Sequence, residues 1–300
     1  MRKTTSLRQK RIGDLVAGQQ IEVDEKLDKM ATLNYTVPKV MAVANDLNSS
    51  ARDLVKVIQV DPVLTAKVLK MVNSAYFALR DEVTSLSKAI IMLGINTIKN
   101  LAMSTAVAGS LKFNDDVSKV SSEDFWRYSV GAAALSSQFA REMRGGRQEV
   151  DNNFIVGLLH VIGKAFLIQF YPNEFNAVIE ETMRLKCPSS LVEKQHLGVT
   201  HEEIGYKLAE RWQLPDPVKD GILHYANPEA SDYRSTRFLA VASALLKEAQ
   251  IGFAGDYFVH PITDTVWEEL GSDKDRAIEV MDEHLDRELE KASAFIQGGL

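Results

Sequence analysis

Apolar residues recur every three or four positions along almost the whole chain, and runs that alternate apolar and polar residues are nearly absent. The first pattern is typical of helices that bury one face, whereas alternation marks half-buried strands. Leu54, Val55 and Ile58, for example, would lie together on one helical face. The pattern therefore predicts an all-α fold.

Capping residues mark the ends of several predicted helices in the N-terminal third. Asp61 followed by Pro62 predicts an N-cap with proline at the first helical position. Ser85 or Ser87 can start a further helix, and Gly94 can end it. The next helix is expected to begin at Asn96.

A segment from Phe113 to Ser122 is rich in Asn, Asp and Ser and lacks a long apolar period, so it is predicted to connect two subdomains. Thr200 and Glu203 have the form of a capping box. Beyond the connection, helices are predicted over about residues 124–144, 150–170, 173–186, 201–212 and 217–226. The predicted organisation is an arm over residues 1–24, an N-terminal helical subdomain over 25–112 and a second subdomain over 113–300.

The last long helix is expected to start at Ser272, with Asp275 three residues later. Its apolar stripe consists of Ile278, Met281, Leu285, Leu289 and Phe295. The stripe can cover its own domain, and the alternative is a seam between two copies of the chain in a homodimer.

Composition narrows the class of protein. A content of 45% hydrophobic and 25% charged residues is that of a soluble globular chain. The net charge of -6 argues against a dominant nucleic-acid surface, although Arg2, Lys3 and Arg8 begin a basic arm. The single cysteine, Cys187, excludes an intrachain disulfide and a cysteine-based zinc site, which fits a cytoplasmic location. The sequence has no uninterrupted apolar run of about 18 residues, so no membrane span is predicted.

Three of the six histidines lie near helix ends or glycines. His160 stands in an apolar stretch four residues before Lys164, His201 follows the Thr200 cap, and His224 ends a predicted helix. Imidazole is a good ligand for zinc, iron or manganese, but a hydrolytic site usually adds carboxylates, and none stands beside His160. These histidines can therefore be hydrogen-bonded residues of a helical core or the remnant of a metal site. Trp126 and Trp212 are expected to anchor the core.

Several motifs taken together resemble those of the HDOD family, the HD-related output domains of bacterial signal transduction. The resemblance covers about Leu33 to Ala292. The motifs are Val37-Pro38, Ile58-x-x-Asp61-Pro62-x-Leu64-Thr65, Leu69-x-x-x-Asn73-Ser74-Ala75, Ser85-Leu86-x-x-Ala89-Ile90-x-x-Leu93-Gly94, Gly157-Leu158-Leu159-His160-x-Ile162-Gly163-Lys164, Thr200-His201-x-x-x-Gly205 and Trp212-x-Leu214-Pro215.

The resemblance implies an HD-domain-like helical fold with an N-terminal helical subdomain. HD phosphohydrolases hold metal with a His, a His-Asp pair and a later Asp. At the matching positions this chain has Tyr128, the pair His160-Val161, and the apolar stretch Ala240 to Ala242. The subdomain over 113–300 is thus expected to be a degenerate HD-like domain with no cofactor.

Two histidines resemble auxiliary ligands of two-metal relatives. His201 and His224 occupy these positions, but Tyr225 stands where those relatives carry a further histidine. A weak divalent metal on His160, His201 and His224 therefore stays open as an alternative.

The resemblance implies a non-catalytic signal transduction protein that binds a protein partner or a small regulator. Its candidate pocket consists of Tyr128, His160, Lys164, His201 and His224. The alternative is an atypical metal-dependent phosphohydrolase in which Lys164 meets a phosphate as a point charge. Nucleic-acid regulation through the basic arm is a third and weaker hypothesis.

Overall fold

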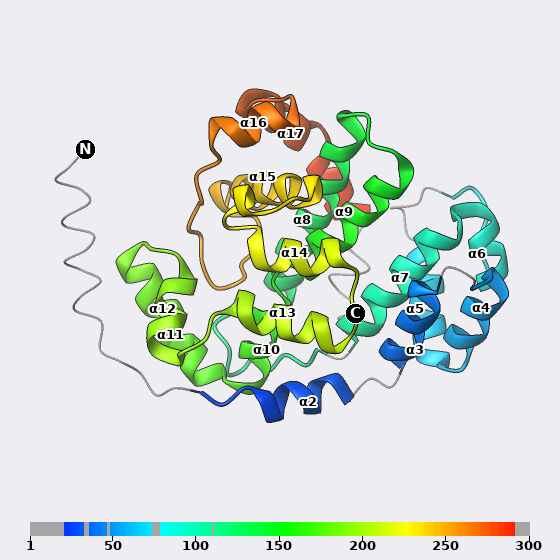
Figure 1. Cartoon of the computed structure of the whole chain (residues 1–300), viewed down its shortest axis with the longest axis horizontal. Helices are drawn as coiled ribbons and strands as arrows, with labels where there is room; N and C mark the ends of the chain where they lie inside the picture. Colours follow the sequence, from blue (N-terminus) through cyan, green and yellow to red (C-terminus); the bar gives the residue numbers. More distant parts are fainter. Residues whose placement is uncertain (1–20, 33–35, 47–48, 74–78, 110, 292–300) are drawn as a thin grey trace.

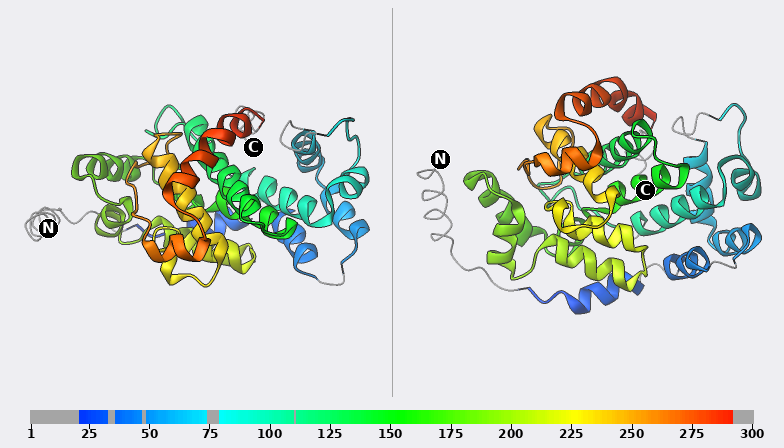
Figure 2. Two further views of the ribbon diagram at one scale, coloured as in Figure 1. Left: turned by 90° about the horizontal axis from the view of Figure 1, so that it is seen from above. Right: turned by 45° about the horizontal axis from the view of Figure 1, so that its top comes forward.

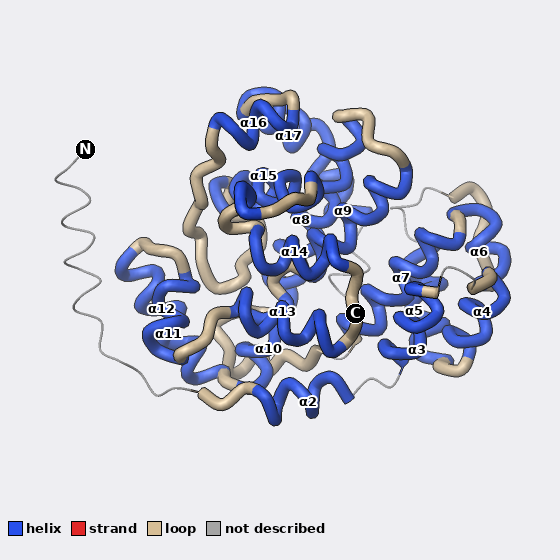
Figure 3. Tube along the Cα trace, viewed as in Figure 1, coloured by secondary structure: helices blue, strands red, loops and turns tan. Residues whose placement is uncertain are grey.

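The computed structural model describes residues 21–32, 36–46, 49–73, 79–109 and 111–291. Within these ranges every regular element is a helix, which confirms the all-α prediction (Figure 3). The basic residues of the N-terminal arm, the motif residues Ser74 and Ala75 and the predicted stripe residue Phe295 lie outside the described residues.

Five helices form the N-terminal group at one end of the molecule (Figure 1). They are α3 (Thr36–Asn45), α4 (Ala51–Gln59), α5 (Pro62–Val72), α6 (Leu86–Leu93) and α7 (Ile95–Ala108). Asp61 caps α5 as predicted, since its Oδ1 accepts from the backbone N–H of Val63 at 3.0 Å and of Leu64 at 2.9 Å. Ser85 caps α6 through the N–H of Lys88 at 3.2 Å.

One predicted start in this group is wrong. Gly94, with φ of +88°, both ends α6 and precedes α7, so Asn96 lies inside α7 and does not cap it. A glycine can adopt this backbone angle without a steric penalty, and the chain therefore changes direction without a loop.

The helices from residue 122 onward form the larger part of the molecule, with α8, α9 and α15 at its centre (Figures 1 and 2). They are α8 (Ser122–Glu142), α9 (Arg147–Leu159), α10 (Ile162–Phe170), α11 (Pro172–Leu185), α12 (Ser189–Leu197), α13 (His201–Arg211), α14 (Asp216–His224), α15 (Arg234–Glu248), α16 (Asp264–Leu270) and α17 (Lys274–Lys291), with a short 3-10 helix at Pro228–Ala230. Of the segment predicted as a connection, Phe113 to Ser122, residues 113–121 form a loop between α7 and α8, and Ser122 begins α8.

The helix predicted over 150–170 is in fact two helices. The chain turns at His160 and Val161, where Val161 has φ of -100° and ψ of 21°. Apolar periodicity continues through this turn, so the sequence pattern does not reveal it. The structure also contains α12, which the sequence analysis did not predict.

α2 (Asp24–Thr32) lies against α13. The Arg211 guanidinium donates to Asp28 at 2.7 Å, and the Lys26 ammonium donates to the carbonyl of Phe170 at 3.1 Å. The start of the predicted N-terminal subdomain thus packs on helices of the second subdomain, while the domain boundaries themselves stay a prediction.

The final helix, α17, begins at Lys274 and not at Ser272. The Asp273 carboxylate accepts from the backbone N–H of Arg276 at 2.8 Å, so it caps this helix. Leu285 and Leu289 are buried, and α17 packs mainly against α8. Within the described residues the helix covers its own chain, and the homodimer stays untested.

Trp126 and Trp212 are buried, as predicted.

Among the described residues, one segment, Glu149–Phe170, is long and apolar enough to cross a membrane by length and composition alone, with a mean hydropathy of 1.6. Of its most apolar window of 18 residues, however, 89% is buried inside the fold, as in the core helices of a globular protein.

Candidate functional site

His160 lies in the centre of the larger part of the molecule and is completely buried. Its Nδ1 donates to the carbonyl of Gly157 at 2.6 Å, because a carbonyl can only accept. Its Nε2 then faces the Tyr128 hydroxyl at 3.4 Å, and that hydroxyl shares a hydrogen bond of 2.8 Å with Ser243. Burial, together with the ammonium groups of Lys247 and Lys164, lowers the pKa of His160 to about 3. The imidazole is therefore neutral.

A carboxylate lies between two ammonium groups next to this histidine. Asp256 accepts from Lys164 at 2.5 Å and from Lys247 at 2.6 Å, and all three side chains are buried. The backbone N–H of Phe258 also donates to Asp256, at 2.9 Å. Burial alone would raise the pKa of Asp256, but the two ammonium groups outweigh it and hold this pKa well below its usual range.

A second histidine, His201, is held by a buried glutamate. Its backbone N–H and its Nδ1 both donate to Oε2 of Glu193, at 2.7 and 2.6 Å. Its Nε2 lies 2.7 Å from the Tyr225 hydroxyl, and the Tyr225 ring packs edge-on against His160 with 4.9 Å between ring centroids. Burial would raise the pKa of Glu193, but His201 and Lys164 lower it. Tyr225 therefore joins the two histidines into one network.

We call this network the buried polar cluster. It consists of Tyr128, His160, Lys164, Glu193, His201, Tyr225, Ser243, Lys247 and Asp256. Its members come from α8, α10, α12, α13 and α15, from the turn before α10 and from the segments after α14 and α15. The cluster is thus assembled only when most of the larger part of the molecule has folded.

Two glycines of the Gly157 to Lys164 segment allow close helix packing, α9 against α8 at Gly157 and α10 against α13 at Gly163. A Cβ on Gly157 would lie 2.5 Å from Cα of Ala133 in α8. A Cβ on Gly163 would collide with the carbonyl oxygen of His201 and would lie 2.8 Å from the backbone nitrogen of Gly205. Glycine is needed at both positions, because the collisions are with backbone atoms that cannot rotate away.

Four of the five predicted pocket residues meet in the buried polar cluster: Tyr128, His160, Lys164 and His201. The fifth, His224, ends α14 and is only partly buried. Its neighbour Tyr225 contacts both histidines, and no described contact joins the His224 side chain to them. The structure thus does not bring His224 into the cluster.

Sequence reasoning left five members of the cluster out of the candidate pocket. One of them, Tyr225, was named only as the residue that replaces a histidine of the two-metal relatives. Ser243 and Lys247 lie one helical turn apart on α15, just after the apolar stretch in which the last HD carboxylate was sought. Glu193 lies on α12, which was not predicted, and Asp256 follows α15 in an irregular segment. Only the spacing of Ser243 and Lys247 offered a signal in the sequence.

The residues around His160 do not fit the divalent metal of an HD phosphohydrolase. Tyr128 presents a phenol and Val161 a buried alkyl group where metal ligands would be needed. The carboxylate of Asp256, which Lys164 and Lys247 share, is already bonded to two ammonium groups and a backbone N–H. Those ammonium groups would repel a divalent cation at the His160 ring.

The side chains around His201 resemble a cation site more than those around His160 do. Among the described residues, ligand atoms of Glu193, His201 and Glu202 lie within 4.8 Å of one another. Oε1 of Glu193 and Oε2 of Glu202 are buried and accept no hydrogen bond in the described part of the chain. Both nitrogens of His201 are occupied, however, so a cation there would have to displace Glu193 or Tyr225.

The buried polar cluster is closed to solvent. His160 and Lys164 are 0% exposed, and Tyr128 and His201 are each 2% exposed. A phosphodiester could reach His160 only if the helices around it moved apart. The arrangement as it stands stabilises the fold, and it offers no open position for a substrate.

Comparison with known proteins gives both family and fold. The HDOD domain family model matches residues 30–228. An uncharacterized protein of Treponema pallidum (strain Nichols) is 27% identical over 225 residues, which is 74% of this chain and 42% of that protein. The chain thus spans about two-fifths of the length of this curated relative.

Three solved structures have similar folds. A candidate signal transduction protein from Marinobacter aquaeolei VT8 has a TM-score of 0.75 and 29% identity, over 99% of this chain and 65% of that one. An HDOD domain protein of unknown function from Geobacter sulfurreducens has a TM-score of 0.68 and 21% identity, over 97% of both chains. A candidate phosphohydrolase from Shewanella amazonensis SB2B has a TM-score of 0.69 and 23% identity, over 90% and 96%.

The family match covers about two thirds of the chain and includes the helices that carry Tyr128, His160, Lys164 and His201. The helical architecture agrees with that of the three structures. The chain belongs to the HDOD domain family.

Proposed function

We propose that the protein is a cytoplasmic signal transduction protein that acts by binding a protein partner or a small regulator, without catalysing hydrolysis. The observation that carries this proposal is the position of Asp256, which bridges Lys164 and Lys247 beside a neutral His160. The charges at the former hydrolase centre are thus satisfied within the protein.

Hydrolysis of a phosphodiester by an HD enzyme needs a metal that ionises a water molecule. At His160 the groups available are one neutral imidazole, one phenol and two ammonium ions. None of these replaces the charge of the missing carboxylates. The similarity to a structure described as a candidate signal transduction protein points in the same direction.

The alternative function is an atypical phosphohydrolase that uses His160, Lys164 and His201. Two observations keep it testable. The fold of the candidate phosphohydrolase from Shewanella amazonensis SB2B is similar, and two carboxylate oxygens beside His201 have no partner among the described residues. It would require Lys164 to leave Asp256 and the cluster to open.

A turnover assay separates the two. Purified protein is incubated with manganese, iron, magnesium or zinc ions and with bis(p-nitrophenyl) phosphate or nucleotides. The matched variants are His160→Gln, in the cluster, and His284→Gln, on α17. We expect the wild-type protein to show no more turnover than His160→Gln. Metal-dependent turnover that persists in His284→Gln and is lost in His160→Gln would establish the phosphohydrolase instead.

A test in cells addresses the signalling role directly. The gene is replaced by the His160→Gln allele, and transcript levels are compared with those of the wild type and a deletion. Because the buried polar cluster is closed to solvent, binding at an exposed surface predicts that His160→Gln behaves as the wild type, provided that the variant is folded. A catalytic function predicts that it behaves as the deletion.

A further inference from the structure

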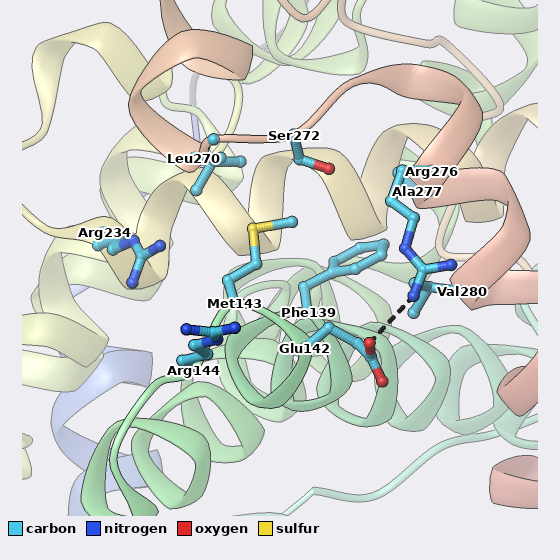
Figure 4. Close-up of a pocket in the computed structure, with 11 residues that line it drawn as sticks. Phe139, Glu142, Met143, Arg144, Arg234, Leu270, Ser272, Arg276, Ala277 and Val280 are labelled. Carbon is cyan, nitrogen blue, oxygen red and sulfur yellow. Dashed lines mark hydrogen bonds and ion pairs between the residues drawn. The ribbon is translucent and has the colours of Figure 1, made fainter.

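A pocket of about 300 Å³ lies far along α8 from Tyr128, where the end of α8 meets the start of α15 and the turn between α16 and α17 (Figure 4). Three arginines line it: Arg144, Arg234 and Arg276. The apolar side chains of Phe139, Met143 and Leu270 form part of its wall. Its volume is at the lower end of the range for small-molecule sites.

The pocket carries an excess of positive charge. Its single lining carboxylate, Glu142, is already paired with Arg276 at 3.1 Å. Arg234 makes a long ion pair of 3.6 Å with Glu149, and its guanidinium lies over the Phe238 ring at 5.0 Å from the ring centroid. The Arg144 guanidinium is exposed and has no ion pair or hydrogen bond among the described residues. Arg144 and Arg234 are therefore available to an anion.

The backbone at Arg144 is unusual for an arginine. Its φ is +56°, in the left-handed region that helix ends usually fill with glycine. A side chain in this conformation costs on the order of 1 kcal/mol. Lys186, Gln213 and Gln250 adopt the same conformation after other helices, so the left-handed backbone by itself assigns no ligand to Arg144.

Ser272 provides a further polar group. Its hydroxyl oxygen is buried, lines the same pocket and has no hydrogen-bond partner in the described part of the chain. Figure 4 shows it on the wall formed by the turn before α17, with Arg144 and Arg234 together at one end of the pocket. A buried hydroxyl without a partner is costly, and a ligand could satisfy it.

We propose that this pocket binds a small phosphorylated molecule of about the size of a nucleoside monophosphate. Arg144 and Arg234 hold the phosphate, because guanidinium groups donate paired hydrogen bonds to phosphate oxygens. Phe139, Met143 and Leu270 contact the less polar part of the ligand, and Ser272 donates to it. The inference concerns a place separate from the buried polar cluster and does not depend on whether that cluster is catalytic.

The pocket also connects to the cluster through two helices. Arg144 follows the end of α8 and Arg234 begins α15, and these helices carry Tyr128 and Ser243. A ligand that bridges the two arginines would link the ends of both helices. Binding should therefore raise the melting temperature of the full chain.

The test is calorimetric titration of the full chain with the four nucleoside 5′-monophosphates, with inorganic phosphate and with uncharged nucleosides. We expect saturable binding of at least one monophosphate, at least tenfold weaker binding of inorganic phosphate, and no binding of nucleosides. Equal affinity for phosphate would overturn the assignment to a nucleotide-sized ligand. Lack of binding by every monophosphate would overturn the site.

The variants separate a binding role from a structural one. Arg144→Gly removes the guanidinium and relieves the left-handed backbone, so its melting temperature should equal or exceed that of the wild type while its affinity falls at least tenfold. Arg234→Met should also lose affinity. Arg127→Met, an exposed arginine of α8 outside the pocket, is the matched control and should bind normally. Unchanged affinity in Arg144→Gly would overturn the proposal. The turnover assays on His160→Gln test the proposed function separately, so the two can fail independently.

Discussion

The Nζ of Lys164 lies 2.5 Å from Oδ2 of Asp256, and both side chains are almost completely buried. A buried ion pair is stable only if its remaining hydrogen-bonding capacity is also satisfied, and Lys247 and the N–H of Phe258 fulfil that condition. Glu193, whose pKa Lys164 also lowers, supplies the second negative charge. Two ammonium groups and two carboxylates thus balance in the core.

Asp256→Asn should be strongly destabilising, because it leaves two buried ammonium groups without their shared carboxylate. The expected loss of unfolding free energy is about 3–5 kcal/mol, measured by urea denaturation at pH 7. The control is Glu248→Gln, which removes an exposed pair with Lys274 at 2.9 Å and should cost less than about 1 kcal/mol. Equal losses in the two variants would contradict a structural role for Asp256.

Gly163→Ala should prevent α10 from packing on α13. The added methyl group would meet the backbone of His201 and Gly205, and neither can move without shifting the helix. We expect a loss above about 3 kcal/mol or failure to fold. At Gly146 a Cβ would meet nothing within 4 Å, so Gly146→Ala is the control and should change stability by less than about 1 kcal/mol. A tolerated Gly163→Ala would mean that the helices are farther apart.

The neutral state of His160 makes stability depend on pH. Its folded pKa is about 3, below the ordinary value of 6.5, so between these values the unfolded chain binds a proton that the folded chain does not. Stability should therefore fall as the pH decreases through this window, by up to about 1.4 kcal/mol per pH unit from this group. Asp256, whose folded pKa is lowered, adds no such slope above about pH 5.

His160→Gln removes this slope, so the stability difference from the wild type should shrink by about 2 kcal/mol between pH 7 and pH 5. Urea denaturation at four pH values measures it. His260, whose pKa burial lowers to about 4, leaves a residual slope in both proteins. A pH-independent difference for His160→Gln would show that the folded chain protonates this imidazole as the unfolded chain does.

The sequence allowed prediction of features that depend on neighbouring residues. The caps at Asp61 and Thr200 are local hydrogen bonds, and both are present. The turn at His160 was missed because apolar periodicity continues through it. It is set by the close approach of α10 to α13 at Gly163, which is a tertiary contact.

The same distinction applies to the buried polar cluster. His160, Lys164 and His201 stand in recognisable motifs, so they could be singled out from the sequence. Asp256 stands in an irregular segment, 92 residues after Lys164, and only the fold brings it to that lysine. A charge partner at such a separation leaves no periodic signal.

The hydrogen bond between Tyr128 and Ser243 joins α8 to α15 at 2.8 Å, and a double-mutant cycle measures its strength. Tyr128→Phe and Ser243→Ala should each cost about 1–2 kcal/mol, because each leaves a buried hydroxyl without this partner. The double variant should cost about 1 kcal/mol less than the sum. Ser129→Ala is the control on the same helix: its buried hydroxyl has no partner among the described residues, so removal should be neutral or stabilising. Additive losses for Tyr128 and Ser243 would show that the two hydroxyls do not interact and that α8 and α15 are held at this point by apolar packing alone.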